Sequence, residues 1–353
     1  MKINAAILHV LDFVSCVNVY AQAPMDLGNK TAKRYVTSQA RRCVGNLDSK
    51  RGQFASDSLF ADELRGYFRG ERDFVGLSQQ IAEFVAGELG RMEKTPSTDV
   101  LVVDFEGDPD ETVREMTDAE AEAAFKAQGP RYFAIILLEA RQAYMHEVGT
   151  NDFGDTATTI ARHHAILPNP SQKVASFALI AADGMDVWFV DKQREIAGEK
   201  RWLIPDGLLQ CSMEASSKEV LEAVTTVVEE VAEEYGANTA VALSRAKAYV
   251  AELAEETDEV VARALGHEVF ADQPQVAERF DRAVDEGALP ERVMVEKAVA
   301  KRVTRTHKIR TDTGIELTFP AEYGENAEFI EFFSTPDGRI EIALKNIGSI
   351  ENR

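Results

Sequence analysis

Two runs of apolar residues decide the fold: Val100-Leu101-Val102-Val103-Asp104-Phe105 and Arg131-Tyr132-Phe133-Ala134-Ile135-Ile136-Leu137-Leu138. Both are short and rich in β-branched and aromatic side chains, which is typical of strands. Further strand-like segments lie at 3–22, 159–167, 173–181 and 186–190. The first predicts two strands that meet near Ser15-Cys16, and Asp183-Gly184 predicts a turn between the last two. We therefore expect an antiparallel or mixed sheet in the first half of the chain.

Helical patterns accompany these strands. A helix is expected over 31–46, and Asp57 is placed to cap a second helix that ends at Phe68. Asp73 is placed to cap a third helix, whose apolar residues recur at the helical period: Phe74, Leu77, Ile81, Phe84, Val85 and Leu89. The acidic segment 109–127 is also expected to be helical. Together with the strands, these helices predict an α+β domain over residues 1–205, with helices packed against the sheet.

The character of the chain changes twice after this domain. Residues 206–290 form an acidic helical region in which Ser216-x-x-Glu219 is a capping box. An apolar stripe follows the box at Val220, Val224, Val227, Val228 and Val231. Residues 291–353 begin with a basic segment and continue as short strands, with a turn expected at Pro336-Asp337-Gly338. The predicted fold class is α+β: an N-terminal sheet-and-helix domain, an acidic helical middle and a small C-terminal β unit.

Composition limits the class of protein. The chain has 353 residues, of which 45% are hydrophobic and 28% charged, so a mostly disordered chain is excluded. No uncharged apolar run reaches the ~18 residues of a membrane-spanning helix. The three cysteines, Cys16, Cys43 and Cys211, are far apart, which argues against a disulfide framework or a zinc cluster. Ala21-Gln22-Ala23 resembles a signal-peptide cleavage site, but His9 and Asp12 interrupt the apolar stretch before it, which favours a strand.

The net charge of −21 is unevenly distributed along the chain. Residues 214–286 hold 18 acids and 6 bases, so more than half of the excess lies in the helical region. Two other segments are strongly basic, because 292–310 and 30–51 each hold seven bases against one acid. The overall charge would repel nucleic acid at long range, but salt screens charges beyond about 10 Å. Local charge therefore decides whether a phosphate backbone can be bound.

The two basic clusters supply the candidate DNA-binding residues. In the C-terminal cluster these are Lys297, Lys301, Arg302, Arg305, Lys308 and Arg310, and in the N-terminal cluster Lys33, Arg34, Arg41 and Arg42. If the C-terminal segment is helical, Lys297, Lys301, Arg305 and Lys308 share one face. If it is a strand, Arg302, Lys308 and Arg310 share one face. Either geometry makes a stripe that suits phosphate oxygens, and we expect this stripe to contribute more than the N-terminal cluster.

Signals for catalysis are weak. The chain has no GxGxxG, GxxxxGK[ST], GxSxG or HExxH pattern, and we predict no cofactor. Asp104 and Glu106 at a strand end could belong to a nuclease with His146, but the expected lysine and further acids are missing. His163 and His164, near Asp152 and Asp155, would point to opposite faces of a strand, so we predict no metal site.

The C-terminal segment Lys308-Ile309-Arg310-Thr311-Asp312-Thr313-Gly314-Ile315-Glu316-Leu317 resembles a motif of the 37-kDa nucleoid-associated bacterial proteins, the NdpA-like family. Pro336-Asp337-Gly338-Arg339-Ile340 and Leu344-Lys345-Asn346-Ile347-Gly348 are similar to its closing motif. Weaker similarities follow in the family's order: His9-Val10-Leu11-Asp12, Phe74 with Ser78, Tyr144-Met145-His146, and Ile166-Leu167-Pro168 with Ser171-Gln172-Lys173.

This resemblance implies a cytoplasmic, nucleoid-associated protein that binds double- and single-stranded DNA, with no catalytic residues. It also implies topoisomerase IV as a partner of at least some relatives. We therefore expect a non-enzymatic DNA-binding protein without strong sequence preference, no association with membranes, and a homodimer as one expected assembly. Two alternatives remain open: an acidic interaction module for a DNA enzyme such as topoisomerase IV, and a metal-dependent nuclease in an anti-phage locus.

Overall fold

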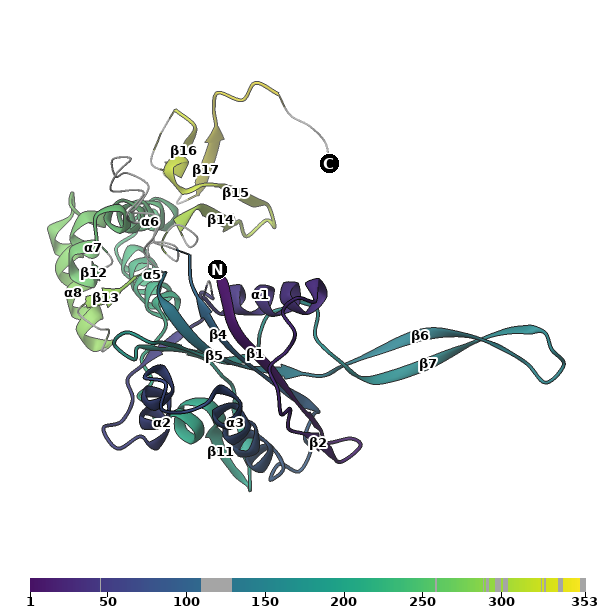
Figure 1. Cartoon of the computed structure of the whole chain (residues 1–353). Coiled ribbons are helices and arrows are strands. Elements are labelled where there is room, and N and C mark those ends of the chain that lie inside the picture. Colours follow the sequence, from purple (N-terminus) through teal and green to yellow (C-terminus); the bar gives the residue numbers. More distant parts are fainter. Residues whose placement is uncertain are drawn as a thin grey trace, which may run out of the picture. The chain divides into compact units, whose positions relative to one another are not determined.

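The computed structural model places two compact units along the chain, Met1–Glu214 (unit 1) and Ala215–Arg353 (unit 2) (Figure 1). The structure describes all residues except 45, 109–128, 258, 288, 290–291, 296–299, 301–303, 325, 327, 336–338 and 350–353. The helix expected at 109–127 and the turn expected at 336–338 lie outside the described residues. The α+β class is confirmed. The parts predicted at 206–290 and 291–353 lie mostly within unit 2.

Unit 1 is built on one antiparallel sheet with the strand order β2-β1-β4-β5-β8-β9-β3. Its strands are β1 (Lys2–Asp12), β2 (Val17–Val19), β3 (Lys50–Gly52), β4 (Thr98–Glu106), β5 (Arg131–Glu139), β8 (Ser176–Ala181) and β9 (Val187–Val190). The two runs that open the sequence argument are the neighbours β4 and β5, paired from Thr98↔Glu139 to Glu106↔Arg131. The expected sheet is thus confirmed and is antiparallel throughout.

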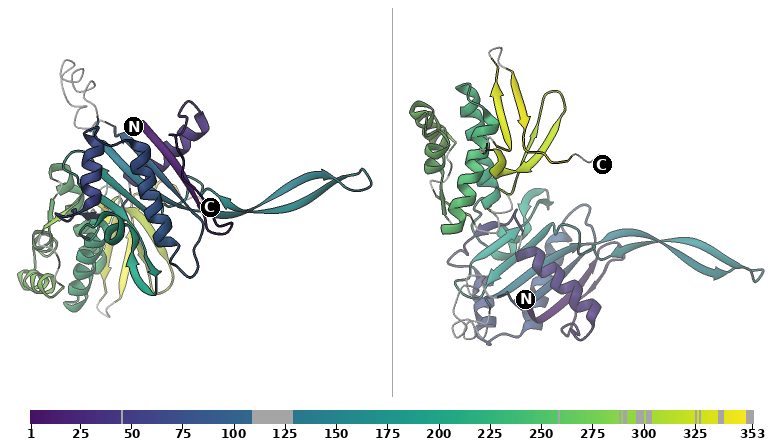
Figure 2. Two further views of the ribbon diagram at one scale, coloured as in Figure 1. Left: turned by 60° about the horizontal axis from the view of Figure 1, so that its bottom comes forward. Right: turned by 90° about the horizontal axis from the view of Figure 1, so that it is seen from above.

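Helices cover both faces of this sheet (Figures 1 and 2). On one face, α1 (Lys30–Val44) packs with its buried Val36, Ala40 and Cys43. On the other face lie α2 (Leu59–Phe68), α3 (Phe74–Leu89) and the π-helical turn η2 (Leu203–Leu209). The hairpin of β10 (Gln193–Ile196) and β11 (Glu199–Trp202), which directly precedes η2 in the chain, lies on the same side. Alternate residues of β4 point to opposite cores, with Val100 and Val102 on the α3 side and Leu101 and Val103 on the α1 side. Burial on both faces is why β4 and β5 are uninterrupted apolar runs.

The helix boundaries follow from their caps. Asp73 caps α3 as predicted, because its side chain accepts a hydrogen bond from the Gly76 amide at 2.8 Å. The cap of α2 is Ser58 and not Asp57 as predicted, since the Ser58 hydroxyl accepts from Ala61 N and donates to Leu209 O at 2.8 Å. Asp and Ser are equally good caps, so the sequence could not separate two adjacent candidates. The buried contact to η2 decides between them.

One hairpin of unit 1 stands apart from the sheet. Strands β6 (Arg141–Thr150) and β7 (Thr156–Ile166) pair with each other as a two-stranded sheet of their own. Figures 1 and 2 show this hairpin, hereafter the arm (residues 141–166), extending away from the body of unit 1. The strand expected at 159–167 is therefore confirmed as part of β7, whereas the pattern of β6 gave no strand prediction.

Unit 2 combines helices with short hairpins. Its helices are α5 (Ser217–Glu234), α6 (Thr239–Glu256), α7 (Ala262–Val269) and α8 (Pro274–Glu286). Its strands are β12 (Glu259–Val261), β13 (Arg292–Met294), β14 (Thr306–Arg310), β15 (Glu316–Pro320), β16 (Ile330–Ser334) and β17 (Ile340–Leu344), with the 3-10 turn η3 (Ala321–Gly324). The predicted capping box at Ser216 and Glu219 is present, and the valine stripe of α5 packs into the core of this unit.

Close packing of α7 on α8 yields a first prediction. A Cβ atom added at Gly266 would meet the Phe280 ring at 2.1 Å, and Phe280 is fully buried. Gly266→Ala should therefore lower the free energy of unfolding by about 1–3 kcal/mol. Gly87→Ala is the matched control, because Gly87 lies in α3 with nothing within 4 Å and should raise stability by roughly 0.5–1 kcal/mol. Urea unfolding of both variants measures the two changes, and equal shifts would contradict the packing argument.

Buried His307 yields a second prediction. Its Nδ1 atom lies 2.8 Å from the Ser244 hydroxyl, and its ring stacks on Phe319. Burial, with a smaller contribution from the Lys247 charge, lowers the pKa of His307 to about 4. In the unfolded chain the pKa of His307 is about 6.5, so below this pH the unfolded state binds more protons than the folded state. The free energy of unfolding therefore falls as the pH falls below 6.5. Between pH 7 and 5 the wild type should lose about 2 kcal/mol more than His307→Gln in urea unfolding; equal losses would contradict the assignment.

Candidate nucleic-acid interface

The N-terminal basic cluster lies mainly on one exposed side of α1. Lys30, Lys33, Arg34, Arg41 and Arg42 are all exposed, whereas the opposite side of the helix is buried against the sheet. The positions 30, 34 and 41 repeat at helical spacing, so these side chains lie along one stripe. The helix begins under an Asn29 cap, whose side chain accepts hydrogen bonds from the amides of Thr31 and Ala32. The helix that was predicted at 31–46 thus presents the predicted cations together.

A groove runs beside this stripe, between α1 and the loop that follows the arm. It has a volume of about 740 Å³. Its lining combines cations with neutral hydrogen-bonding groups: Lys30, Thr31, Arg34, Tyr35, Ser38, Arg41, Arg42, Asn169, Pro170 and Ser171. Among the described residues, no carboxylate lines it. Guanidinium, ammonium, hydroxyl and amide groups are the donors that proteins use for phosphate oxygens.

The loop wall of the groove is held by hydrogen bonds. The Tyr35 hydroxyl on α1 donates to the backbone oxygen of Pro168 at 2.9 Å. Asn169 Oδ1 accepts from both the amide and the hydroxyl of Ser171 at 2.9 Å. The next residue, Gln172, donates its amide to Asn169 O at 2.8 Å. The two walls are therefore fixed to each other before any ligand binds, which reduces the ordering entropy that binding would cost.

The exposed cations of α1 are available for a ligand. Within the described part of the chain, Lys30, Lys33, Arg34 and Arg42 form no ion pair. Arg41 acts on Asp108, whose pKa is lowered mainly by its hydrogen bond to the N-terminal amine and to a smaller extent by the Arg41 charge. Cations without a carboxylate partner can exchange water and counterions directly for phosphate.

The C-terminal cluster is only partly described. Lys297, Lys301 and Arg302 lie outside the described residues, and Arg305 is exposed. The segment 306–310 is a strand, so the strand alternative holds there, and Lys308 and Arg310 share its exposed face. Both lie near Glu316 on the paired strand β15, at 3.3 Å and 3.9 Å. This shared carboxylate offsets part of their charge, which the sequence could not indicate without the strand register.

The residues of the nuclease alternative do not meet. Asp104 is buried and accepts from Arg131 Nε at 3.1 Å and from the Tyr67 hydroxyl at 2.5 Å. Glu106 pairs with Lys2 at 3.0 Å, and His146 lies in the arm. Asp104 thus neutralises Arg131 within the fold. Its donors occupy the oxygens that a metal ion would need.

The histidines of the arm lie far from the acids beside them in sequence. His163 is near the base of the arm, opposite Ala143, whereas Asp152 and Asp155 lie in the turn at its tip. Across the described residues, no three His, Cys, Asp or Glu side chains gather as a metal site would need. The cysteines Cys16, Cys43 and Cys211 are free thiols.

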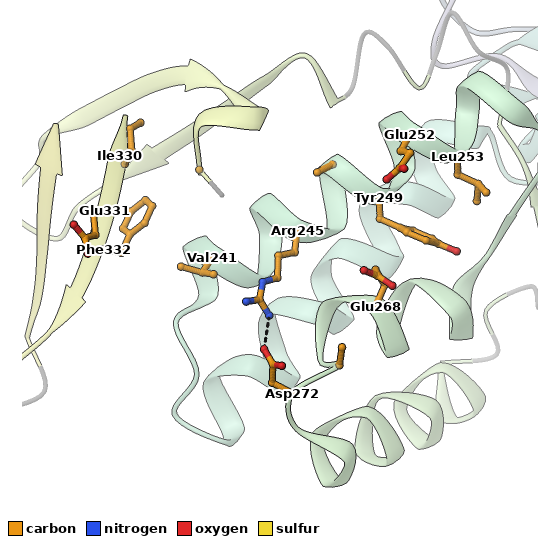
Figure 3. A pocket seen from close by; sticks show the side chains of 13 residues that line it. Val241, Arg245, Tyr249, Glu252, Leu253, Glu268, Asp272, Ile330, Glu331 and Phe332 are labelled. Atoms are coloured by element: carbon orange, nitrogen blue, oxygen red, sulfur yellow. Dashed lines mark ion pairs between the residues drawn. The ribbon is translucent and has the colours of Figure 1, made fainter. Parts of the chain in front are cut away.

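Unit 2 holds a second cavity, with the opposite charge (Figure 3). It has a volume of about 880 Å³ and lies between α6, the end of α7 and β16. Its charged lining is mainly acidic: Glu252, Glu268, Asp272 and Glu331, against Arg245. Arg245 lies 3.6 Å from Asp272, as the dashed line in Figure 3 marks. Val241, Tyr249 and Phe332 add apolar surface to this lining. A cavity of this composition suits a basic or apolar peptide and not a phosphate.

The comparison with protein families is decisive for identity. The family model of nucleoid-associated protein YejK matches residues 7–352. The chain belongs to this family. The resemblance to the NdpA-like proteins is thereby confirmed, and a DNA-binding role in the nucleoid follows from it. A comparison with curated proteins gives no match. No described helix combines the length and the apolarity that a membrane crossing requires.

The fold brings separate family-like motifs into contact. His9, from the opening motif, lies with its Nε2 atom 3.0 Å from the hydroxyl of Ser78, which the resemblance pairs with Phe74. His9 Nδ1 accepts from the Ala21 amide at 3.1 Å, and burial lowers the pKa of His9, so the ring is neutral at pH 7. The Ile166–Pro168 and Ser171–Lys173 motifs flank the groove loop of this nucleoid-associated protein. The resemblance flagged these residues, but residue chemistry alone did not suggest that they form one wall of a basic groove.

The burial of Asp104 yields a third prediction. Asp104→Asn removes the negative charge opposite Arg131 and should lower the free energy of unfolding by about 2 kcal/mol, or the melting temperature by roughly 4–8 °C. Wild type and variant should both leave DNA uncleaved with magnesium or manganese, because Asp104 is held by Arg131 and Tyr67. Calorimetry and a plasmid-cleavage assay measure the two effects. Metal-dependent cleavage that is lost in a variant of unchanged stability would restore the nuclease alternative.

Proposed function

We propose that this nucleoid-associated protein binds double- and single-stranded DNA without strong sequence preference and without catalysis, through the groove beside α1. The observation that carries the proposal is the stripe of exposed α1 cations along a groove whose described lining holds no carboxylate. These cations neutralise backbone phosphates, and the Thr31, Ser38 and Ser171 hydroxyls add neutral contacts. Phosphates are common to every sequence and to both strand forms, so such a groove discriminates little between DNA sequences.

The net charge of −21 is compatible with this function because of where the acids lie. More than half of the excess is in residues 215–286, which belong to unit 2, whereas α1 belongs to unit 1. At physiological salt a charge is screened within about 8 Å, so the groove acts on DNA through its own cations. The acids then repel DNA at other surfaces, which limits binding to the groove.

A second function is supported by the acidic cavity of unit 2. We infer that its carboxylates and apolar groups receive a basic peptide of a DNA enzyme, and topoisomerase IV is the candidate that the resemblance implies. This interaction and DNA binding use different units, so both functions fit in one protein. A variant with Glu252→Gln and Glu268→Gln should lose the partner and keep DNA.

The fourth prediction tests the groove. Lys30→Gln, Arg34→Gln and Arg41→Gln together should weaken binding on any duplex or single strand by a similar factor. If wild type neutralises four to six phosphates, a plot of log K against log salt should have a slope of about −4 to −5. The slope of the variant should be smaller in magnitude by roughly one for each phosphate contact removed. Fluorescence anisotropy across a salt series, with oligonucleotides of unrelated sequence, measures both quantities.

Two comparison variants make this test specific. Arg65→Gln, Arg69→Gln and Arg72→Gln remove the same charge from exposed, ion-paired positions of unit 1 and should bind like wild type. Lys301→Ala, Arg302→Ala and Arg305→Ala test the expectation that the C-terminal cluster contributes more. If the α1 variant is folded by circular dichroism and binds like wild type, the groove is not the DNA surface. Loss of DNA binding in the C-terminal variant alone would place the DNA-binding surface at the C-terminal basic cluster.

A further inference from the structure

The arm is unusual among the longer strands of unit 1 because none of its described side chains is buried. Every side chain of β6 except the half-buried Ala143 is exposed. Large apolar groups are among them: Tyr144 at 71%, Val148 at 65% and Ile160 at 75% exposure, and Phe153 at the tip at 90%. Soluble proteins rarely leave contiguous apolar surface of this kind uncovered unless it is a contact site.

The register of the arm gathers these groups on one side. Residues that oppose each other directly share a face of a two-stranded sheet. Tyr144 opposes Arg162, His146 opposes Ile160, and Val148 opposes Thr158. Arg162 lies over the Tyr144 ring at 6.0 Å. This face therefore carries an aromatic and two aliphatic side chains in a continuous row.

The arm also lacks the devices that protect free strands. A two-stranded hairpin is only marginally stable alone in water, and exposed strand edges invite pairing. Natural edges are commonly blocked by proline, lysine or bulges in mid-strand, but residues 141–166 contain neither proline nor lysine. The one register shift lies at the base, between Arg141 and Ala143. Both long edges are thus open to another chain.

The charge of the arm argues against DNA as its binding partner. Residues 141–166 hold two bases, Arg141 and Arg162, and three acids, Glu147, Asp152 and Asp155. An element that binds phosphates carries excess positive charge. The surface is near-neutral and apolar, which is the composition of a contact with protein.

A matching apolar surface lies at the end of the sheet from which the arm departs. Asp12 at the end of β1 approaches Ser97, and Thr98 pairs with Glu139, which precedes the arm. Beyond Asp12 the turn and edge strand β2 expose Val14 at 67%, Val17 at 51% and Val19 at 50%. Strand β2, which carries Val17 and Val19 of this valine patch (Val14, Val17 and Val19), therefore lies on the same side of unit 1 as the base of the arm, as Figure 1 shows.

We propose that two copies of the chain associate by exchanging arms, each arm lying on the other copy's valine patch and arm base. A ribbon of ten residues per strand is roughly 33 Å long and about 10 Å wide, so the one face that lies on a partner offers roughly 330 Å². That is well below the roughly 600–1,000 Å² per partner of a standard interface, so one arm on a foreign surface is insufficient. Reciprocal exchange doubles the buried area to roughly 660 Å² per copy, because each copy gives one arm and receives one. A twofold dimer is the assembly with this property.

The fifth prediction tests the arm in the full-length chain. Sedimentation velocity should show a wild-type dimer, and a variant with Val148→Lys and Ile160→Lys should sediment as a monomer with its dimer affinity reduced at least tenfold. Leu59→Lys with Ile315→Lys is the matched control, since it also replaces two exposed apolar residues by lysine, at positions that belong neither to the arm nor to the valine patch. This control should remain dimeric. A monomeric wild type, or a dimeric arm variant, overturns the proposal.

Two further measurements cover the case in which the arm variant misfolds. Val17→Lys with Val19→Lys alters the receiving patch, leaves the arm intact and should also give monomers. Hydrogen exchange of the wild type should show arm amides whose protection rises with protein concentration, at a constant rate for the β4 and β5 amides. Arm exchange that does not change with concentration contradicts association through the arm. DNA binding does not enter these readouts, so they are independent of the proposed function.

Discussion

The burial of β4 and β5 on both faces is the constraint on which unit 1 depends. A sheet whose central strands are apolar on both sides is stable only if both sides are covered. Helices α2 and α3 cover one side, and in the described part of unit 1 the helical cover on the other side is α1. The apolar side of α1 is therefore committed to the sheet, and its remaining side must face solvent. The cations of that side are presented as a row because the core fixes the rotation of the helix.

Acidic and basic side chains of this nucleoid-associated protein are concentrated on different helices, each on the faces that the core leaves exposed. Acids concentrate on the helices of unit 2, where an apolar stripe faces the core and the other faces remain for charge. Cations concentrate on α1, and carboxylates close to cations elsewhere are largely paired, as in Asp104 with Arg131. A chain of strongly negative total charge thereby keeps one surface that attracts a polyanion. Each unit can be altered in charge without changing the core of the other.

The sequence predicted the parts of the fold that depend on local pattern. Apolar runs identified β4 and β5, and caps at Asp73 and Ser216 placed two helices correctly. It did not predict β6, because a strand exposed on both faces has no apolar periodicity to detect. The sequence also did not predict the loop wall of the groove, because Tyr35 and Pro168 come into contact only in the tertiary fold. The pairing of Lys308 and Arg310 with Glu316 likewise required the register of β14 on β15.

The position of the groove loop in the chain has a mechanical consequence. Strand β7 ends at Ile166, and the backbone oxygen of Pro168 is already bound to Tyr35 on α1. Only Leu167 separates the protruding hairpin from the wall of the basic groove. The hydrogen bond that ties the two walls of the groove together therefore lies two residues from the base of the arm. A partner that holds the arm would thus be anchored close in the chain to the residues that line the groove.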